Sequence, residues 1–123
     1  MNDLLRNKEQ LRERLEQAER ELMDPKVLSD ARAMKRFGRE RNQATELLAA
    51  MAEYESALAT VSEREGLLHD SADADLVTLA RDEIDGARKR AEETESRLRM
   101  LLIPKDPNDG KSAIIEIRAG TGG

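Results

Sequence analysis

The sequence contains no cysteine and no tryptophan, and it has a single phenylalanine and a single tyrosine. The absence of cysteine excludes disulfides, thiolate zinc sites and a cysteine nucleophile, and it favours a reducing compartment. Scarce aromatic residues disfavour a β-sandwich or a large core built on rings. No apolar run approaches the roughly 20 residues that span a bilayer, and the N-terminus is charged where a signal peptide would be apolar. We therefore expect a soluble, cytoplasmic protein with no membrane partner.

Charged residues make up 38% of the chain, and 21 bases against 26 acids give a net charge of −5. The two signs are segregated, because six bases lie within residues 26–41 and eight acids lie within residues 42–75. A net negative chain disfavours non-specific nucleic-acid binding, which depends on neutralising phosphates. A local contact with RNA remains open.

Apolar residues recur at helical spacing in the N-terminal part of the chain, which predicts a helix over roughly Asp3 to Met23. Asp24 followed by Pro25 ends this helix, because the proline ring disfavours helical geometry at the preceding residue. Asp24 is also expected to cap a short turn that starts at Pro25. The predicted apolar stripe of this helix consists of Leu4, Leu11, Leu15, Ala18 and Leu22.

A second helix is predicted from Ser29, as its N-cap, to about Leu68. At a rise of 1.5 Å per residue it is roughly 60 Å long, so it requires a partner helix of similar length. Its predicted stripe is Met34, Phe37, Ala44, Leu48, Met51, Leu58 and Val61.

A third helix is predicted from about Ala74 to Leu102, after a polar break in which Asp73 is the expected cap. Its predicted stripe is Leu76, Ala80, Ile84, Ala87, Ala91, Thr94, Leu98 and Leu101. Gly38 and Gly86 lie inside the predicted helices at a cost of about 1 kcal/mol each relative to alanine, so we expect close backbone packing at both.

These three segments predict a mainly α fold, either a long antiparallel helical hairpin or a three-helix coiled-coil bundle, over residues 1–103. Residues 104–123 have a different composition. A turn-rich linker is followed by an expected strand from Ser112 to Arg118. A lone strand cannot form a sheet. We therefore expect residues 104–123 to be the linker and first strand of a truncated α+β second domain.

The linker and strand carry a specific resemblance. They contain Leu101, Leu102, Ile103, Pro104, Lys105, Asp106, Pro107, Asn108 and Asp109, followed by Ile115, Glu116, Ile117, Arg118, Ala119, Gly120, Thr121, Gly122 and Gly123. This stretch resembles the junction between the first and second domains of bacterial class I peptide chain release factors. It is similar to the type that reads UAG and UAA, and it departs from the His-Ala-Gly-Ala-Gly-Gly run usual in the type that reads UGA.

The resemblance implies a role in translation termination as a helical domain that binds the ribosome. Implied partners are ribosomal RNA and protein at the stalk region of the large subunit, together with the GTPase release factor. The family hydrolyses peptidyl-tRNA with a Gly-Gly-Gln tripeptide and reads the codon with a Pro-x-Thr tripeptide, and neither occurs in this sequence. We therefore expect no enzymatic activity, cofactor, metal, small-molecule substrate or catalytic residue in this chain. The alternative function is a free-standing coiled-coil protein-interaction module.

One candidate site remains, a set of bases at steps of three, one and three residues: Arg32, Lys35, Arg36 and Arg39. Clustered cations on one helical face are suited to contact RNA phosphates without reading bases. The alternative is a solvated face partly neutralised by acids of a neighbouring helix. The acidic stretch from Glu46 to Asp75 likewise has two interpretations, contact with a basic ribosomal protein or solubility of a long exposed helix. His69, in a polar loop whose acids serve as caps, does not predict a metal site.

Overall fold

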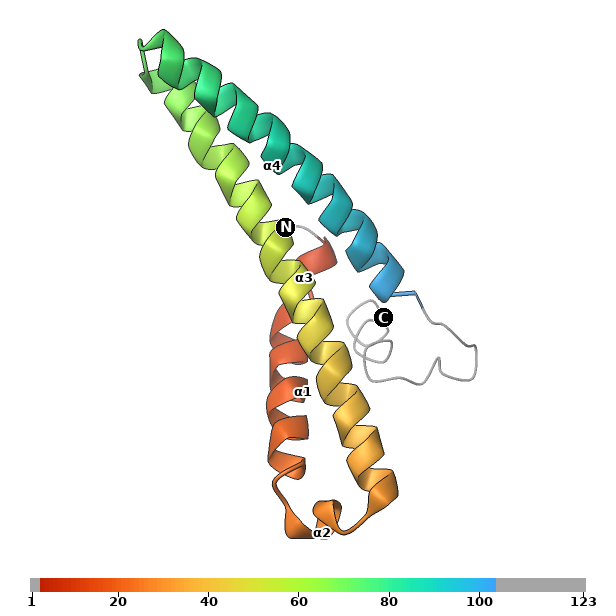
Figure 1. Ribbon diagram of the computed structural model, residues 1–123. Helices are drawn as coiled ribbons and strands as arrows, with labels where there is room; N and C mark the ends of the chain where they lie inside the picture. The colour runs from red at the N-terminus through yellow and green to blue at the C-terminus, as the bar shows by residue number, and fades with distance from the viewer. Residues whose placement is uncertain (1–2, 104–123) are drawn as a thin grey trace. The chain divides into compact units, whose positions relative to one another are not determined.

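The computed structural model describes residues 3–103, which contain five helical elements in chain order (Figure 1). Helix accounts for 88% of this part of the chain, and it contains no strand. The predicted linker and the predicted strand from Ser112 to Arg118 lie outside the described residues. The elements are the 3₁₀ helix η1 (Asp3–Leu5) and the α-helices α1 (Lys8–Glu21), α2 (Pro25–Leu28), α3 (Ala31–Asp70) and α4 (Ala74–Leu101).

The first predicted helix is wrong at its start, because α1 begins at Lys8 and not at Asp3. The preceding residues form the 3₁₀ turn η1, in which the Arg6 amide donates to the Asp3 carbonyl at 3.3 Å. Asn7 then precedes α1 with φ −96° and ψ 12°, outside the helical region. Leu4 is nevertheless buried, so the apolar spacing identified a core position that does not lie in the α-helix.

Asp24 caps α2 as predicted, because its Oδ1 accepts from the Lys26 amide at 2.9 Å and Pro25 occupies the first helical position. The predicted N-cap of α3 is wrong by one residue. Asp30 Oδ1 accepts from the amides of Arg32 at 3.1 Å and Ala33 at 3.2 Å. The Ser29 hydroxyl instead donates to the Lys26 carbonyl at 3.1 Å, at the end of α2. The Asp30 carboxylate thus accepts from two of the free amides in the first turn of α3, which makes Asp30 the N-cap residue.

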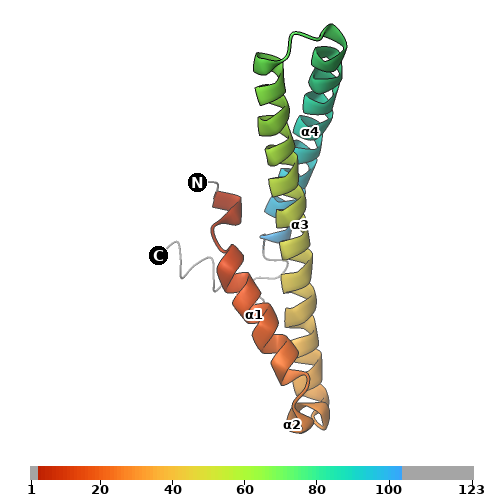
Figure 2. The ribbon, with the colours of Figure 1, turned by 90° about the vertical axis from the view of Figure 1, so that its left-hand side faces the viewer.

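The described residues divide into two compact units. Unit 1 comprises residues 3–49 and 99–103. Within it, α1 lies alongside the N-terminal part of α3 (Figures 1 and 2). The buried side chains of unit 1 are apolar: Leu4, Leu11, Ala18, Val27, Ala44 and Leu47.

Unit 2 comprises residues 50–98 and is an antiparallel helical hairpin. Three ion pairs join the rest of α3 to α4, and their sequence separations of 19, 23 and 44 residues grow with distance from the connecting loop. This order confirms the hairpin prediction. The Asp73 cap is also confirmed, since its Oδ1 accepts from the Asp75 amide at 2.9 Å and the Leu76 amide at 3.4 Å.

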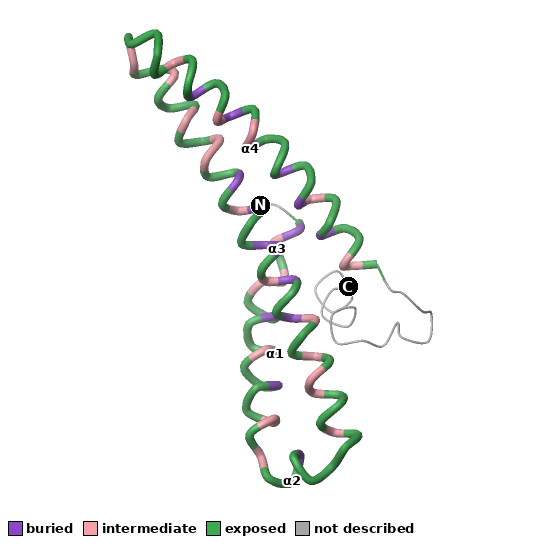
Figure 3. The backbone as a smooth tube through the Cα atoms, viewed as in Figure 1, coloured by how far each residue is buried: buried purple, intermediate pink, exposed green. Residues whose placement is uncertain are grey.

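Buried positions recur along both helices of unit 2 (Figure 3), and small side chains dominate among them. Its buried residues are Ala50, Met51, Tyr54, Ala57, Ala80, Ile84, Ala87, Ala91, Thr94 and Leu98. The predicted stripe of the third helix is therefore confirmed from Ala80 to Leu98. It is wrong at its start, where Leu76 is 52% exposed near the loop. Alanines bury little area, so each contributes less than a leucine would.

The predicted stripe of α3 is only partly correct. Ala44 and Met51 are buried, but Met34 is 40% exposed and Leu58 is 38% exposed. Leu47, which was not predicted, is 1% exposed, whereas the predicted Leu48 is half-buried. Neighbouring helical positions differ by about 100° around the axis, and both are leucine here, so spacing alone does not select between them.

The expected close packing at the two helical glycines is wrong. A Cβ atom added at Gly38 would have no heavy atom within 4 Å, and one added at Gly86 would meet only Nη1 of Arg90 at 3.8 Å. Neither glycine has positive φ. Packing within the described part of the chain therefore does not require glycine at either position.

Candidate functional site

The four predicted bases Arg32, Lys35, Arg36 and Arg39 lie in the N-terminal part of α3, and all four are exposed. Their spacing places them within an arc of about 100° around the helix axis. We call this set the basic stripe. Of the two buried residues of α3 in unit 1, Ala44 lies on a different side of the helix, whereas Leu47 lies about 20° from Arg36 around the axis and about three turns further along. The structure therefore brings the four predicted residues together on an open face.

Within residues 3–103, three of the four stripe residues have no ion-pair partner. Among residues 3–103, no carboxylate oxygen lies within 4.0 Å of the charged nitrogens of Arg32, Lys35 or Arg39. Arg36 is the exception, with its Nε 3.9 Å from Glu40 Oε1 in the next turn of α3. In this part of the chain, no acid of a neighbouring helix forms an ion pair with these bases, whereas their exposure agrees with the other half of the alternative interpretation, a solvated face.

Arg36 makes a second local contact, because its guanidinium carbon lies 4.7 Å from the centroid of the Phe37 ring. A cation above an aromatic face gains about 0.5–1 kcal/mol at an exposed site. The contact restricts the guanidinium to the surface beside the ring while leaving the side chain exposed. Sequence spacing gave no signal for it, since adjacent helical residues do not ordinarily face one another.

The stripe occupies the unfavourable end of α3 for positive charge. Peptide dipoles place partial positive charge at a helix N-terminus, where cations cost roughly 0.3–1 kcal/mol each and acids are favoured. The first turn of α3 has no acidic residue, and Arg32 lies within it. Asp30, just before the helix, uses its carboxylate on backbone amides. The interaction with the helix dipole therefore does not explain the position of Arg32.

In unit 2, unlike in the stripe, three arginines form ion pairs with glutamates on the other helix. Arg64 Nε lies 2.8 Å from Glu83 Oε2, Arg97 Nη1 lies 3.0 Å from Glu53 Oε2, and Arg88 Nη2 lies 3.4 Å from Glu65 Oε2. Each pair links α3 to α4. Glu53 and Glu65 belong to the predicted acidic stretch, so part of that stretch stabilises the hairpin. These pairs were not predicted, because they depend on the register of two helices that the loop alone does not fix.

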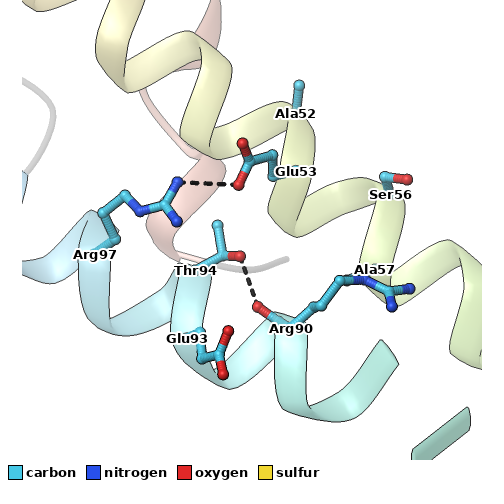
Figure 4. Close-up of a pocket in the computed structure, with 8 residues that line it drawn as sticks. All are labelled: Ala52, Glu53, Ser56, Ala57, Arg90, Glu93, Thr94 and Arg97. Atoms are coloured by element: carbon cyan, nitrogen blue, oxygen red, sulfur yellow. Dashed lines mark hydrogen bonds and ion pairs between the residues drawn. The ribbon is translucent and has the colours of Figure 1, made fainter. Parts of the chain in front are cut away.

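A shallow groove lies between α3 and α4 within unit 2, and the Arg97–Glu53 ion pair forms part of its wall (Figure 4). Thr94 is 3% exposed, and its hydroxyl donates to the Arg90 carbonyl at 2.6 Å. Throughout the described residues, no buried side-chain nitrogen or oxygen lacks a hydrogen-bond partner. The buried Thr94 hydroxyl and the Arg97–Glu53 pair of this groove are therefore engaged within the protein.

Within residues 3–103, no three or more histidine and carboxylate side chains are grouped so that they could hold a metal ion. His69 is an exposed residue in the last turn of α3, and not in the polar loop where it was predicted. None of the described helices has both the length and the apolar character needed to cross a membrane.

A helical hairpin, an exposed basic stripe and ion pairs used for structure are features of an all-helical binding domain. The family model of the PCRF domain matches residues 11–123, and the chain belongs to this family. No solved structure matches the chain significantly.

The curated relatives include several proteins named peptide chain release factor 1. The chain is 35% identical to that of Bacteroides fragilis over 122 residues, which cover 99% of this chain and 33% of the relative. It is 40% identical to that of Myxococcus xanthus over 115 residues, and 39% identical to that of Desulforudis audaxviator over 113 residues. These alignments cover 94% and 92% of this chain, and 32% of each relative. The chain thus spans about a third of the length of these relatives.

Proposed function

We propose that this chain acts in translation termination as the helical, ribosome-binding domain of a class I peptide chain release factor. The observation that carries the proposal is identity of 35–40% to proteins named peptide chain release factor 1 across nearly the whole chain. The basic stripe and the hairpin supply surfaces for binding, and the sequence contains neither tripeptide that the family uses for chemistry and codon reading. In this proposal the domain positions the factor on the ribosome and is not itself an enzyme.

The proposal also covers the codon type, the cellular location and the position on the ribosome. The factor is of the type that reads UAG and UAA, which is supported by the resemblance of residues 104–109 and 115–123 and by the names of the relatives. It works in the cytoplasm, and its domain faces the stalk region of the large subunit, near the GTPase release factor. No cofactor, metal, membrane or small-molecule substrate takes part.

A domain exchange tests the central proposal. The segment of Myxococcus xanthus release factor 1 that aligns with this chain is replaced by the chain, and peptide release is measured on ribosomes programmed with stop codons. We expect release within about tenfold of the unmodified relative, which corresponds to about 1.4 kcal/mol in the barrier. The control exchange inserts an unrelated helical hairpin of equal length. Release no better than with this control would overturn the proposal and favour a free-standing interaction module.

The codon type has its own test, which is to sequence the coding region past the codon for Gly123. We expect the frame to continue into Gly-Gly-Gln and Pro-x-Thr motifs. A stop codon directly after Gly123, or a continuing frame without Pro-x-Thr, would overturn the assignment to the UAG and UAA type.

A further inference from the structure

The basic stripe, Arg32, Lys35, Arg36 and Arg39, differs from every arginine that joins the hairpin of unit 2. Arg64, Arg88 and Arg97 each contact a glutamate on the other helix. Three stripe residues contact no carboxylate among residues 3–103, and all four are exposed. The chain has 26 acids and 21 bases, so acids are plentiful. Bases left unpaired in such a chain are available to an external anion.

Two features of α3 leave this face open to an anion. The first turn carries no acidic side chain, and the Asp30 carboxylate, which offsets the partial positive charge of the helix N-terminus, bonds the amides of Arg32 and Ala33 and forms no ion pair with the stripe. The Phe37 ring holds the Arg36 guanidinium at the surface.

We propose that the basic stripe binds the sugar-phosphate backbone of structured RNA without reading its bases. The stripe extends over eight residues of helix, or about 10 Å from Arg32 to Arg39, so it faces more than one phosphate and not a single ion. Arginine predominates in it, and the planar guanidinium suits phosphate oxygens. Phe37 is half-buried and is the only aromatic residue on α3 near the stripe, which leaves no platform on which exposed bases stack. The contact therefore positions the domain and carries no sequence preference.

This proposal rests on the proposed function, because it names the ribosomal component that the domain would contact. It goes beyond the proposed function by assigning the contact to four residues and to the phosphate backbone. An acidic protein surface is the competing partner. The stripe places four cations along about 10 Å of one helix face, and an RNA helix presents anions along its whole length.

The test measures the affinity of the whole chain for a fluorescent RNA hairpin as a function of salt. The stripe variant carries Arg32→Gln, Lys35→Gln and Arg39→Gln, and the control variant carries Arg41→Gln, Arg81→Gln and Lys89→Gln. The control residues are exposed bases outside the stripe, so both variants change the net charge equally. Arg41 is nine residues from Arg32, about half a turn away around the same helix. Glutamine preserves helix propensity, and circular dichroism checks that both variants stay helical.

We expect the stripe variant to bind the hairpin at least about tenfold more weakly at low salt, with a slope of log affinity against log salt shallower by about two to three units. The control variant should stay within about threefold of the wild type, and a hairpin of scrambled sequence should bind equally well. Equal losses in both variants would overturn the proposal, as would a strong sequence preference. Binding of polyglutamate in preference to RNA would identify an acidic protein partner and would overturn it too.

The two proposals fail separately. Peptide release by the domain exchange, combined with unchanged RNA binding by the stripe variant, would remove only the assignment of the stripe. Loss of RNA binding in the stripe variant, combined with a domain exchange no better than its control, would remove the role in termination and keep the RNA contact.

Discussion

The Nε of Arg64 on α3 donates to Oε2 of Glu83 on α4 at 2.8 Å, the shortest of the three ion pairs described between these helices. Both side chains are 36% exposed, against 58% and 50% for the Arg88–Glu65 pair. Water screens the more exposed pair more strongly, so the two pairs should differ in strength although both join the same helices.

A double-mutant cycle measures this difference. We expect a coupling free energy of about 0.5 kcal/mol between Arg64→Gln and Glu83→Gln, and about 0.2 kcal/mol between Arg88→Gln and Glu65→Gln. Urea unfolding followed by circular dichroism gives the four stabilities that each cycle needs. Added salt should reduce both couplings. A larger coupling for the Arg88 pair would contradict the described geometry.

The N-cap of α3 gives a second prediction. Replacing Asp30 with alanine removes the acceptor of two backbone amides and should cost about 1 kcal/mol of stability. Ser29→Ala removes a single hydroxyl bond to the Lys26 carbonyl, and we expect a smaller loss of about 0.5 kcal/mol or less. Thermal unfolding of the two variants shows which substitution lowers the stability more. A greater loss for Ser29→Ala would restore Ser29 as the cap.

The third prediction concerns which side of α3 faces the core. Leu47 is 1% exposed and Leu48 is half-buried, so truncation to alanine should cost about 2–4 kcal/mol at Leu47 and about 1 kcal/mol at Leu48. Both substitutions delete the same atoms from adjacent residues, and their difference therefore reports burial alone. Equal losses in chemical denaturation would show that the buried face of α3 is rotated from the one described.

Gly38 gives a fourth prediction. Alanine at this position meets no heavy atom within 4 Å and should raise the stability by about 0.5–1 kcal/mol, because glycine loses more backbone entropy in a helix. Gly66→Ala, at another glycine of α3 with the same free space, is the matched substitution. Melting temperatures of both variants test the expectation. A decrease at Gly38 alone would reveal a close approach that the described residues do not contain.

The fifth prediction concerns the activity of the chain on its own. Because the sequence contains no Gly-Gly-Gln, we expect the chain alone to release no peptide above background from ribosomes programmed with a stop codon. A relative such as the Myxococcus xanthus release factor 1 serves as the positive control. Release by the chain alone would show that it contains a hydrolytic group among residues assigned here to binding and packing.

The sequence by itself determined the helical class, the short turn after Asp24 and the break capped by Asp73. These features depend on local chemistry, since a carboxylate beside free amides and a proline at the first helical position act within a few residues. It also determined which bases share the stripe, because Arg32 and Arg39 are related by helical spacing alone.

The tertiary structure decided which apolar residues are buried and which charged residues pair, because helical spacing alone does not settle either. It selected Leu47 over Leu48 for the core and exposed Leu76 beside the loop, because burial depends on which side of a helix faces a partner. It also decided which charges are used internally. Glu83 meets Arg64 through the register of two antiparallel helices, whereas Lys35 meets no acid among the described residues. Pairing depends on distances between segments far apart in the chain, and those distances exist only once the helices have packed.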